Sequence, residues 1–207
     1  KYDEAEKYFF QLRKLNPENV RYIIALAELK KIDKNLTEAM HLYLEAFSLE
    51  PNRYDLLETA GRFAINLNDA VKAKSIFKDL SKAIPNEERY LQIFIDLVSR
   101  SNSFNEGIAH IEELNNIHGE TLERRGQLGL LYYRSGSTEK ARELLKSVIE
   151  DSPKNPNYYF SLFDIYMESS NHNKAAELGD MLIANYPEDW RGSYSRSLVY
   201  MNENDSE

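Results

Sequence analysis

The residues best suited to metal or acid–base chemistry are scattered along the chain. The four histidines, His41, His110, His118 and His172, occupy different places in the sequence pattern, and no two of them are three or four residues apart. Such spacing would not put two of them on one helix face. Metal ligation needs ligands that converge. We therefore interpret each as a surface or turn histidine.

Other kinds of catalytic site have equally little support in the sequence. The acidic pairs Glu112-Glu113 and Glu150-Asp151 fall near predicted helix ends, where solvated charge is the simplest interpretation. The chain has no cysteine, which excludes disulfides, thiolate metal sites and a cysteine nucleophile. It has no Gly-rich phosphate loop and no Gly-x-Ser-x-Gly elbow. We expect a protein that is not an enzyme and that has no cofactor and no metal site.

Composition indicates a folded chain with an acidic second half. Of 207 residues, 42% are hydrophobic and 29% are charged, which is typical of a folded protein. No apolar run is long enough to cross a bilayer. Residues 1–103 are neutral, and residues 104–207 carry the whole net charge of −8, which argues against nucleic acid as a partner. The compartment stays open, with the cytoplasm slightly favoured over the periplasm.

A period of 34 residues organises the chain. Five of the six prolines occupy one position of this period: Pro17, Pro51, Pro85, Pro153 and Pro187. Gly119 occupies the same position in the remaining repeat. Proline or glycine at a fixed interval predicts a repeated helix stop.

Three further columns of residues keep the same period. One is small: Ala5, Ala39, Ala73, Gly107, Ala141 and Ala175. Four residues later, a mostly large column holds Phe9, Tyr43, Phe77, Ile111, Leu145 and Gly179, followed three residues later by Leu12, Ala46, Leu80, Leu114, Val148 and Leu182. These spacings place the columns on one face of a helix. A second amphipathic helix precedes each one, after which turn residues follow at Lys34-Asn35, Asn68-Asp69, Asn102-Ser103, Gly136-Ser137 and Ser170-Asn171.

This unit of helix, turn, helix and proline resembles the tetratricopeptide repeat (TPR), and the resemblance covers the whole chain without an insertion or deletion. It implies an all-α fold, a right-handed superhelical α-solenoid of helix-turn-helix repeats. Gly107, Gly119 and Arg125 depart from the family's usual residue types. Because Gly119 replaces the proline, we expect a softer joint at residues 115–121; the alternative is a simple glycine C-cap.

The repeat boundaries follow from this register. We expect one array over residues 1–207: the second helix of a truncated repeat at 1–19, the first helix of a further repeat at 190–207, and full repeats at 20–53, 54–87, 88–121, 122–155 and 156–189. The half-repeats at both ends suggest a window from a longer chain.

At positions where the two helices of a repeat face each other, the two side chains have complementary sizes. The predicted pairs are mostly small against large, with the order reversed in the last: Ala27/Tyr43, Gly61/Phe77, Ile95/Ile111, Gly129/Leu145 and Phe163/Gly179. Close packing conserves the total volume at such a pair rather than the identity of each residue.

The resemblance implies a non-catalytic protein–protein interaction scaffold that binds a peptide or helix of a partner protein in a concave groove lined by the first helices. The family's carboxylate-clamp pattern is absent. From Leu130 onward the predicted lining turns apolar and aromatic, and we expect the partner-binding strip to consist of Leu130, Tyr133, Phe160, Met167, Tyr194, Leu198 and Met201. The alternatives are an interaction or regulatory arm of a larger enzyme or regulator, and a self-assembly module that forms a homo-oligomer. The strip itself has a further alternative, in which a continuation of the chain covers it.

Overall fold

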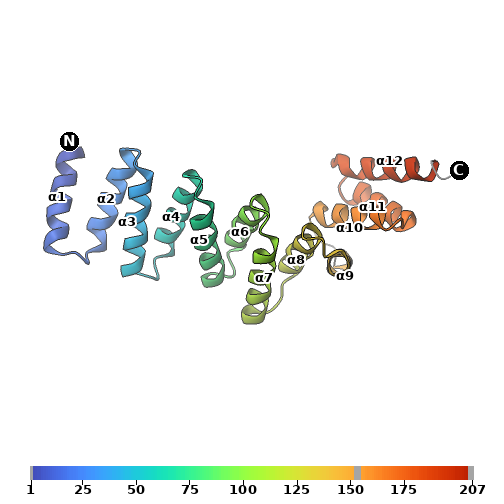
Figure 1. Ribbon diagram of the computed structural model, residues 1–207, viewed down its shortest axis with the longest axis horizontal. Helices are drawn as coiled ribbons and strands as arrows, with labels where there is room; N and C mark the ends of the chain where they lie inside the picture. Colours follow the sequence, from blue (N-terminus) through green and yellow to red (C-terminus); the bar gives the residue numbers. More distant parts are fainter. Residues whose placement is uncertain (1, 152–154, 205–207) are drawn as a thin grey trace. The chain divides into compact units, whose positions relative to one another are not determined.

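The described part of the computed structural model, residues 2–151 and 155–204, contains twelve α-helices and no strand (Figure 1). The predicted all-α, TPR-like fold is therefore confirmed. No helix in these ranges combines the length and the apolar character that a membrane span requires. Pro153, one of the predicted helix stops, lies outside the described residues.

The chain forms two compact units, Lys1–Asn102 and Ser103–Glu207. In each unit, every helix packs against the next one in the sequence. The first unit contains α1 (Tyr2–Leu15), α2 (Val20–Ile32), α3 (Leu36–Leu49), α4 (Tyr54–Asn66), α5 (Ala70–Ala83) and α6 (Glu88–Arg100). The second contains α7 (Phe104–His118), α8 (Leu122–Arg134), α9 (Thr138–Glu150), α10 (Pro156–Glu168), α11 (His172–Asn185) and α12 (Trp190–Asn204).

One backbone device ends the first helix of each repeat. A left-handed residue follows α2, α4, α6, α8 and α10 at positions that are 34 apart: Lys34 (φ 60°), Asn68 (φ 57°), Asn102 (φ 51°), Gly136 (φ 82°) and Ser170 (φ 55°). At the first of these turns the Asn35 N–H donates to the Lys30 carbonyl (2.9 Å) and the Lys34 N–H to the Lys31 carbonyl (3.1 Å). These two bonds define a Schellman motif, which satisfies carbonyls at the helix end.

The residue after each left-handed position is the N-cap of the second helix. The side chains of Asn35, Asp69 and Asn171 accept hydrogen bonds from the N–H groups three residues later, at the starts of α3, α5 and α11. A side chain in this role satisfies a donor that has no partner within the helix. Because the left-handed residue that ends the first helix is followed directly by the N-cap of the second, these hairpins turn within a few residues.

The small and large columns form the core. Ala39, Ala73, Ala141 and Ala175 are fully buried, and Tyr43, Phe77 and Leu145 are at most 4% exposed. Helix α1 differs from the others because it has no buried residue, and its Leu12 is 38% exposed. Within its unit α1 has a helix on one side only, which explains the difference.

Two of the predicted size-compensated pairs are in tight contact. A Cβ added at Gly61 would lie 3.0 Å from the Phe77 ring, and one added at Gly129 would lie 2.9 Å from Leu145. At Gly179 the predicted partner, Phe163, is not among the nearest neighbours. The three atoms nearest to an added Cβ there belong to Arg196 of α12, at 3.0–3.5 Å, and none belongs to Phe163. The next helix in the unit therefore lies closest to Gly179 and favours a small residue at this position.

The placement of His110 was also predicted wrongly. This side chain is buried, with 1% of its surface exposed, and its Nδ1 lies 3.8 Å from a carboxylate oxygen of Glu113 on the next turn of α7. His41 and His118 are exposed, as expected, and His172 is half-buried at the start of α11. The period-3.6 pattern alone did not distinguish the buried flank of α7 from its surface.

The joint between α7 and α8 is held by a buried arginine. Gly119 ends α7 with φ 80°, and nothing lies within 4 Å of an added Cβ. Arg124, 7% exposed, donates to the carbonyl oxygens of Gly119 (2.6 Å) and Leu114 (3.4 Å). A cation at a helix C-terminus is stabilising. The soft joint expected at residues 115–121 stays a prediction, and Arg124 opposes it.

The left-handed turn residues give a first prediction. Ser170→Gly should raise the free energy of unfolding by roughly 1 kcal/mol, because glycine adopts φ 55° without the steric cost that a Cβ imposes. Gly136→Ala, at the same position of the preceding repeat, should lower it by a similar amount. Urea unfolding monitored by circular dichroism measures both. A loss of stability in Ser170→Gly would contradict this account of the turns.

The neighbours of Gly179 give a second prediction. Gly179→Leu should overpack α11 against α12 and cost roughly 1–3 kcal/mol. Arg196→Ala should recover part of this cost, whereas Phe163→Gly should add to it independently. Two double-mutant cycles separate the cases. Stronger coupling of Gly179 to Phe163 than to Arg196 would show that the packing described above is incorrect.

Candidate functional site

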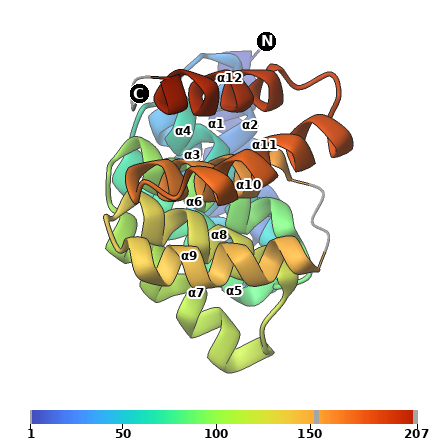
Figure 2. The same ribbon diagram turned by 90° about the vertical axis from the view of Figure 1, so that its right-hand side faces the viewer.

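The residues of the predicted binding strip come from three helices of the second unit. Helix α10 contacts both α8 and α12 and lies between them (Figure 2). Tyr133 on α8, and Phe160 and Met167 on α10, are half-buried, while Tyr194 and Met201 on α12 are 45% and 64% exposed.

One member of the strip is less exposed than a role as contact residue requires. Leu130 is only 8% exposed, whereas Leu198 is half-buried like Phe160 and Met167. Leu130 therefore packs inside the protein and presents little surface to a ligand. The accessible part of the strip lies on α10 and α12, together with Tyr133.

An acidic pair lies beside Tyr133. The Tyr133 hydroxyl points to Asp164 Oδ2 (3.5 Å) and Glu168 Oε1 (3.4 Å), which are long distances for hydrogen bonds. Among the described residues, neither carboxylate has a lysine, arginine or histidine nitrogen within ion-pair distance. Two acidic groups thus lie beside the strip, and no basic side chain of the described residues balances their charges.

Burial changes the acidity of this group of side chains. It raises the pKa of Asp164 to about 6, and repulsion from Glu168 acts in the same direction, while the contact with Tyr133 opposes both. Burial, followed by the two carboxylates, also raises the pKa of Tyr133 to about 12. A cation brought to Asp164 would remove the unfavourable repulsion and favour its ionised form.

An arginine is held in place next to Phe160. Arg191, at the start of α12, donates from Nη2 to Asp189 Oδ2 (2.5 Å) and from Nη1 to Asn157 Oδ1 on α10 (2.5 Å). Its guanidinium lies 5.9 Å from the centre of the Phe160 ring, which stacks on Phe163 at 6.0 Å. Arg191 therefore joins the start of α12 to α10 and fixes one edge of the strip.

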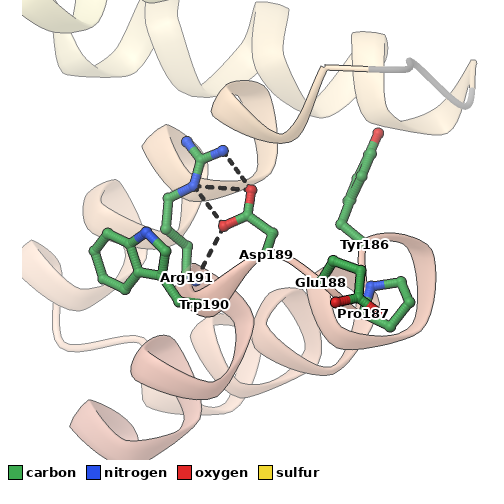
Figure 3. A pocket seen from close by; sticks show the side chains of 6 residues that line it. All are labelled: Tyr186, Pro187, Glu188, Asp189, Trp190 and Arg191. Atoms are coloured by element: carbon green, nitrogen blue, oxygen red, sulfur yellow. Dashed lines mark hydrogen bonds and ion pairs between the residues drawn. The ribbon is translucent and has the colours of Figure 1, made fainter.

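The sequence interpretation missed Trp190. This single tryptophan is 68% exposed and makes an edge-to-face contact with Tyr194, with 5.5 Å between ring centres. It borders an open depression of about 720 Å³ along the connection from α11 to α12, lined by Tyr186 through Arg191 (Figure 3). Trp190 lies four residues before Tyr194, so the helical spacing of the strip could have identified it.

A carboxylate of the first unit, on α4, has its charge balanced by neighbouring side chains. Glu58 of α4 accepts hydrogen bonds from Arg62 (2.7 Å), from Tyr90 (2.7 Å) and from Arg89 (3.1 Å). Although burial alone would raise the pKa of Glu58, the bonds from Tyr90 and Arg62 hold it below its ordinary value. The charge of Glu58 is therefore balanced by its neighbours, in contrast to those of Asp164 and Glu168.

No group of three or more histidine, aspartate or glutamate side chains in the described ranges is arranged to hold a metal ion.

The raised pKa of Asp164 gives a third prediction. Its folded-state pKa lies above the ordinary value of 3.8, so ionisation of Asp164 opposes folding. The resulting destabilisation is absent at low pH and complete above about pH 6. Asp164→Asn should therefore raise the free energy of unfolding more at pH 7.5 than at pH 4. Urea unfolding at both pH values tests this, with the exposed Asp79→Asn as control. Equal effects of Asp164→Asn at the two pH values would contradict it.

Comparisons with known proteins agree with this architecture. Residues 127–202 match the model of a family described as tetratricopeptide repeat. None of the curated proteins matches the chain.

Solved structures with the same fold cover most of the chain. YrrB, described as a TPR protein with an unusual peptide-binding site, is 18% identical with a TM-score of 0.62, over 91% of this chain and 97% of its own. MamA from Desulfovibrio magneticus RS-1 is 18% identical with a TM-score of 0.58, over 82% and 96%. A structure of Naa15/Naa10 bound to HypK-THB is 15% identical with a TM-score of 0.62, over 99% of this chain and 32% of the matched chain.

At these identities the likeness shows the fold, and the family model adds the evidence from sequence. The chain thus shares the fold of solved TPR proteins, and its residues 127–202 match the tetratricopeptide repeat family model.

Proposed function

We propose that this protein is a non-catalytic scaffold that binds a peptide or helix of a partner protein along the strip on α8, α10 and α12. The TPR fold itself implies protein–protein interaction. The choice of the strip rests on one observation, the combination of exposed apolar side chains with the unbalanced carboxylates of Asp164 and Glu168.

The chemistry of the strip supports this assignment. Aromatic and methionine side chains are favoured at the cores of protein interfaces, and here Tyr133, Phe160, Met167 and Tyr194 are at least partly accessible. A partner that carried a basic group among apolar residues would bury the strip and balance its charge. YrrB, whose structure is described as containing a peptide-binding site, offers a precedent within the same fold.

The strip could serve the same purpose as part of a larger assembly. An interaction or regulatory arm would bind its partner through the same residues, and a self-assembly module would bind a second copy of the chain. Light scattering distinguishes the second arrangement from binding of another protein. The division into one array with the repeat boundaries given above is part of the same proposal.

Truncation of two aromatic side chains tests the proposal. Tyr133→Ala combined with Phe160→Ala should reduce capture of the partner at least about tenfold, because aromatic contacts dominate interface energies. The thermal melting curve should change little, since both side chains are only half-buried. Pull-down with the full chain as bait, with quantified captured protein, measures the effect.

The chain offers a matched control for this experiment. Tyr8 and Phe10 on α1 are 69% and 51% exposed and belong to the first unit. Tyr8→Ala with Phe10→Ala removes the same two side-chain types away from the strip and should leave capture unchanged. Normal capture by the Tyr133/Phe160 variant would rule out the strip as the binding site.

A further inference from the structure

An apolar stripe runs along α12 at helical spacing. Trp190, Tyr194, Leu198 and Met201 are separated by four, four and three residues, so they share one face of the helix. Trp190 and Met201 are exposed by 68% and 64%, and Trp190 supports Tyr194 through their ring contact. The stripe therefore begins one turn earlier than the strip predicted from sequence.

The start of this stripe is fixed to the rest of the second unit. Arg191 is bound by Asp189 and by Asn157 of α10, as Figure 3 shows for the bonds to Asp189. The same guanidinium lies over the Phe160 ring at 5.9 Å. The backbone that carries Trp190 is thus held at both sides, and preorganisation of this kind lowers the entropic cost of binding.

We propose that Trp190 anchors an amphipathic helix of a partner protein whose apolar side lies on the α12 stripe and whose lysine or arginine reaches Asp164 and Glu168. This inference rests on the proposed function, and it specifies the anchor, the conformation of the ligand and its charge.

The surface is better suited to bind a helix than an extended peptide. An extended segment needs partners for its backbone N–H and C=O groups, whereas a helix satisfies these groups internally. The side chains of the strip and stripe are apolar or aromatic apart from the two carboxylates, and neighbouring Asn157 is engaged by Arg191. Since Asn157 Oδ1 is already occupied, the described side chains of the strip and stripe offer an extended backbone few polar groups.

Charge complementarity selects a basic helix. Asp164 and Glu168 have no ion-pair partner among the described residues, and residues 104–207 carry 18 acidic and 10 basic side chains. An ammonium or guanidinium placed between the two carboxylates would relieve their mutual repulsion. A ligand with glutamate at the same place would add a third negative charge.

Trp190 is the residue best suited to carry the binding energy. Tryptophan is the type most enriched among energetic hot spots, and this one combines high exposure with support from Tyr194. Because it is the only tryptophan in the chain, its fluorescence reports on this site alone.

The probes for the experiment are two synthetic, tryptophan-free helical peptides with identical leucine faces. One carries lysine and the other glutamate at the positions that flank the leucines. The lysine peptide should shift the emission of Trp190 to the blue and bind at least about tenfold more tightly than the glutamate peptide. Asp164→Asn should weaken the lysine peptide and not the glutamate peptide.

Anisotropy of a labelled lysine peptide measures the variants that change Trp190. Trp190→Ala should weaken binding at least about tenfold. Tyr8→Ala, which removes an exposed aromatic side chain from α1, should have no effect.

Several results would overturn the inference. These are equal affinity for the two peptides, unchanged binding by Trp190→Ala, no binding of either peptide, or a blue shift of Trp190 with protein concentration alone, which would indicate a second copy as the occupant. If partner capture needs Tyr133 and Phe160 but neither Trp190 nor Asp164, the proposed function stands and this inference fails. If capture needs none of them, both fail.

Discussion

The whole structure depends on one constraint: an amphipathic helix of about fourteen residues cannot keep its apolar face from water unless a neighbouring helix covers it. The helices show this dependence directly. Eight residues of α8 are buried between its neighbours, whereas α1, with a helix on one side only within its unit, has none. Stability is therefore shared between adjacent helices rather than concentrated in one central core.

Because adjacent helices stabilise one another, the turns between them must keep each helix in the same position relative to the next. A left-handed residue after each first helix, followed in three hairpins by a capping Asn or Asp, meets the requirement with the same backbone geometry. Four of the five left-handed positions carry a side chain, Lys34, Asn68, Asn102 and Ser170, and so accept some steric cost. The geometry of the turn is thus preserved even where its ideal residue, glycine, is absent.

Packing uses only part of each helix, and the remaining surfaces differ between the units. In the first unit Glu58 is surrounded by Arg62, Arg89 and Tyr90, so its charge is balanced within the protein. In the second unit the carboxylate of Asp164 contacts the Tyr133 hydroxyl and is repelled by Glu168, with no ion-pair partner among the described residues. An unbalanced charge beside apolar surface is costly in the free protein, and a ligand can remove that cost. This difference is the physical basis for assigning binding to the second unit.

The sequence alone determined the fold, because a 34-residue period in prolines, small residues and large residues is compatible with few structures. It also indicated the glycines that face Phe77 and Leu145, since volume is conserved within each hairpin. Only the tertiary structure decided contacts between one hairpin and the next: Arg196 against Gly179, the burial of His110 and Leu130, and the bonds of Arg191 that hold Trp190 beside the strip. The period describes what all repeats share. These contacts depend on residues in which the repeats differ. Which neighbours such side chains contact is determined only when the adjacent helices are in place.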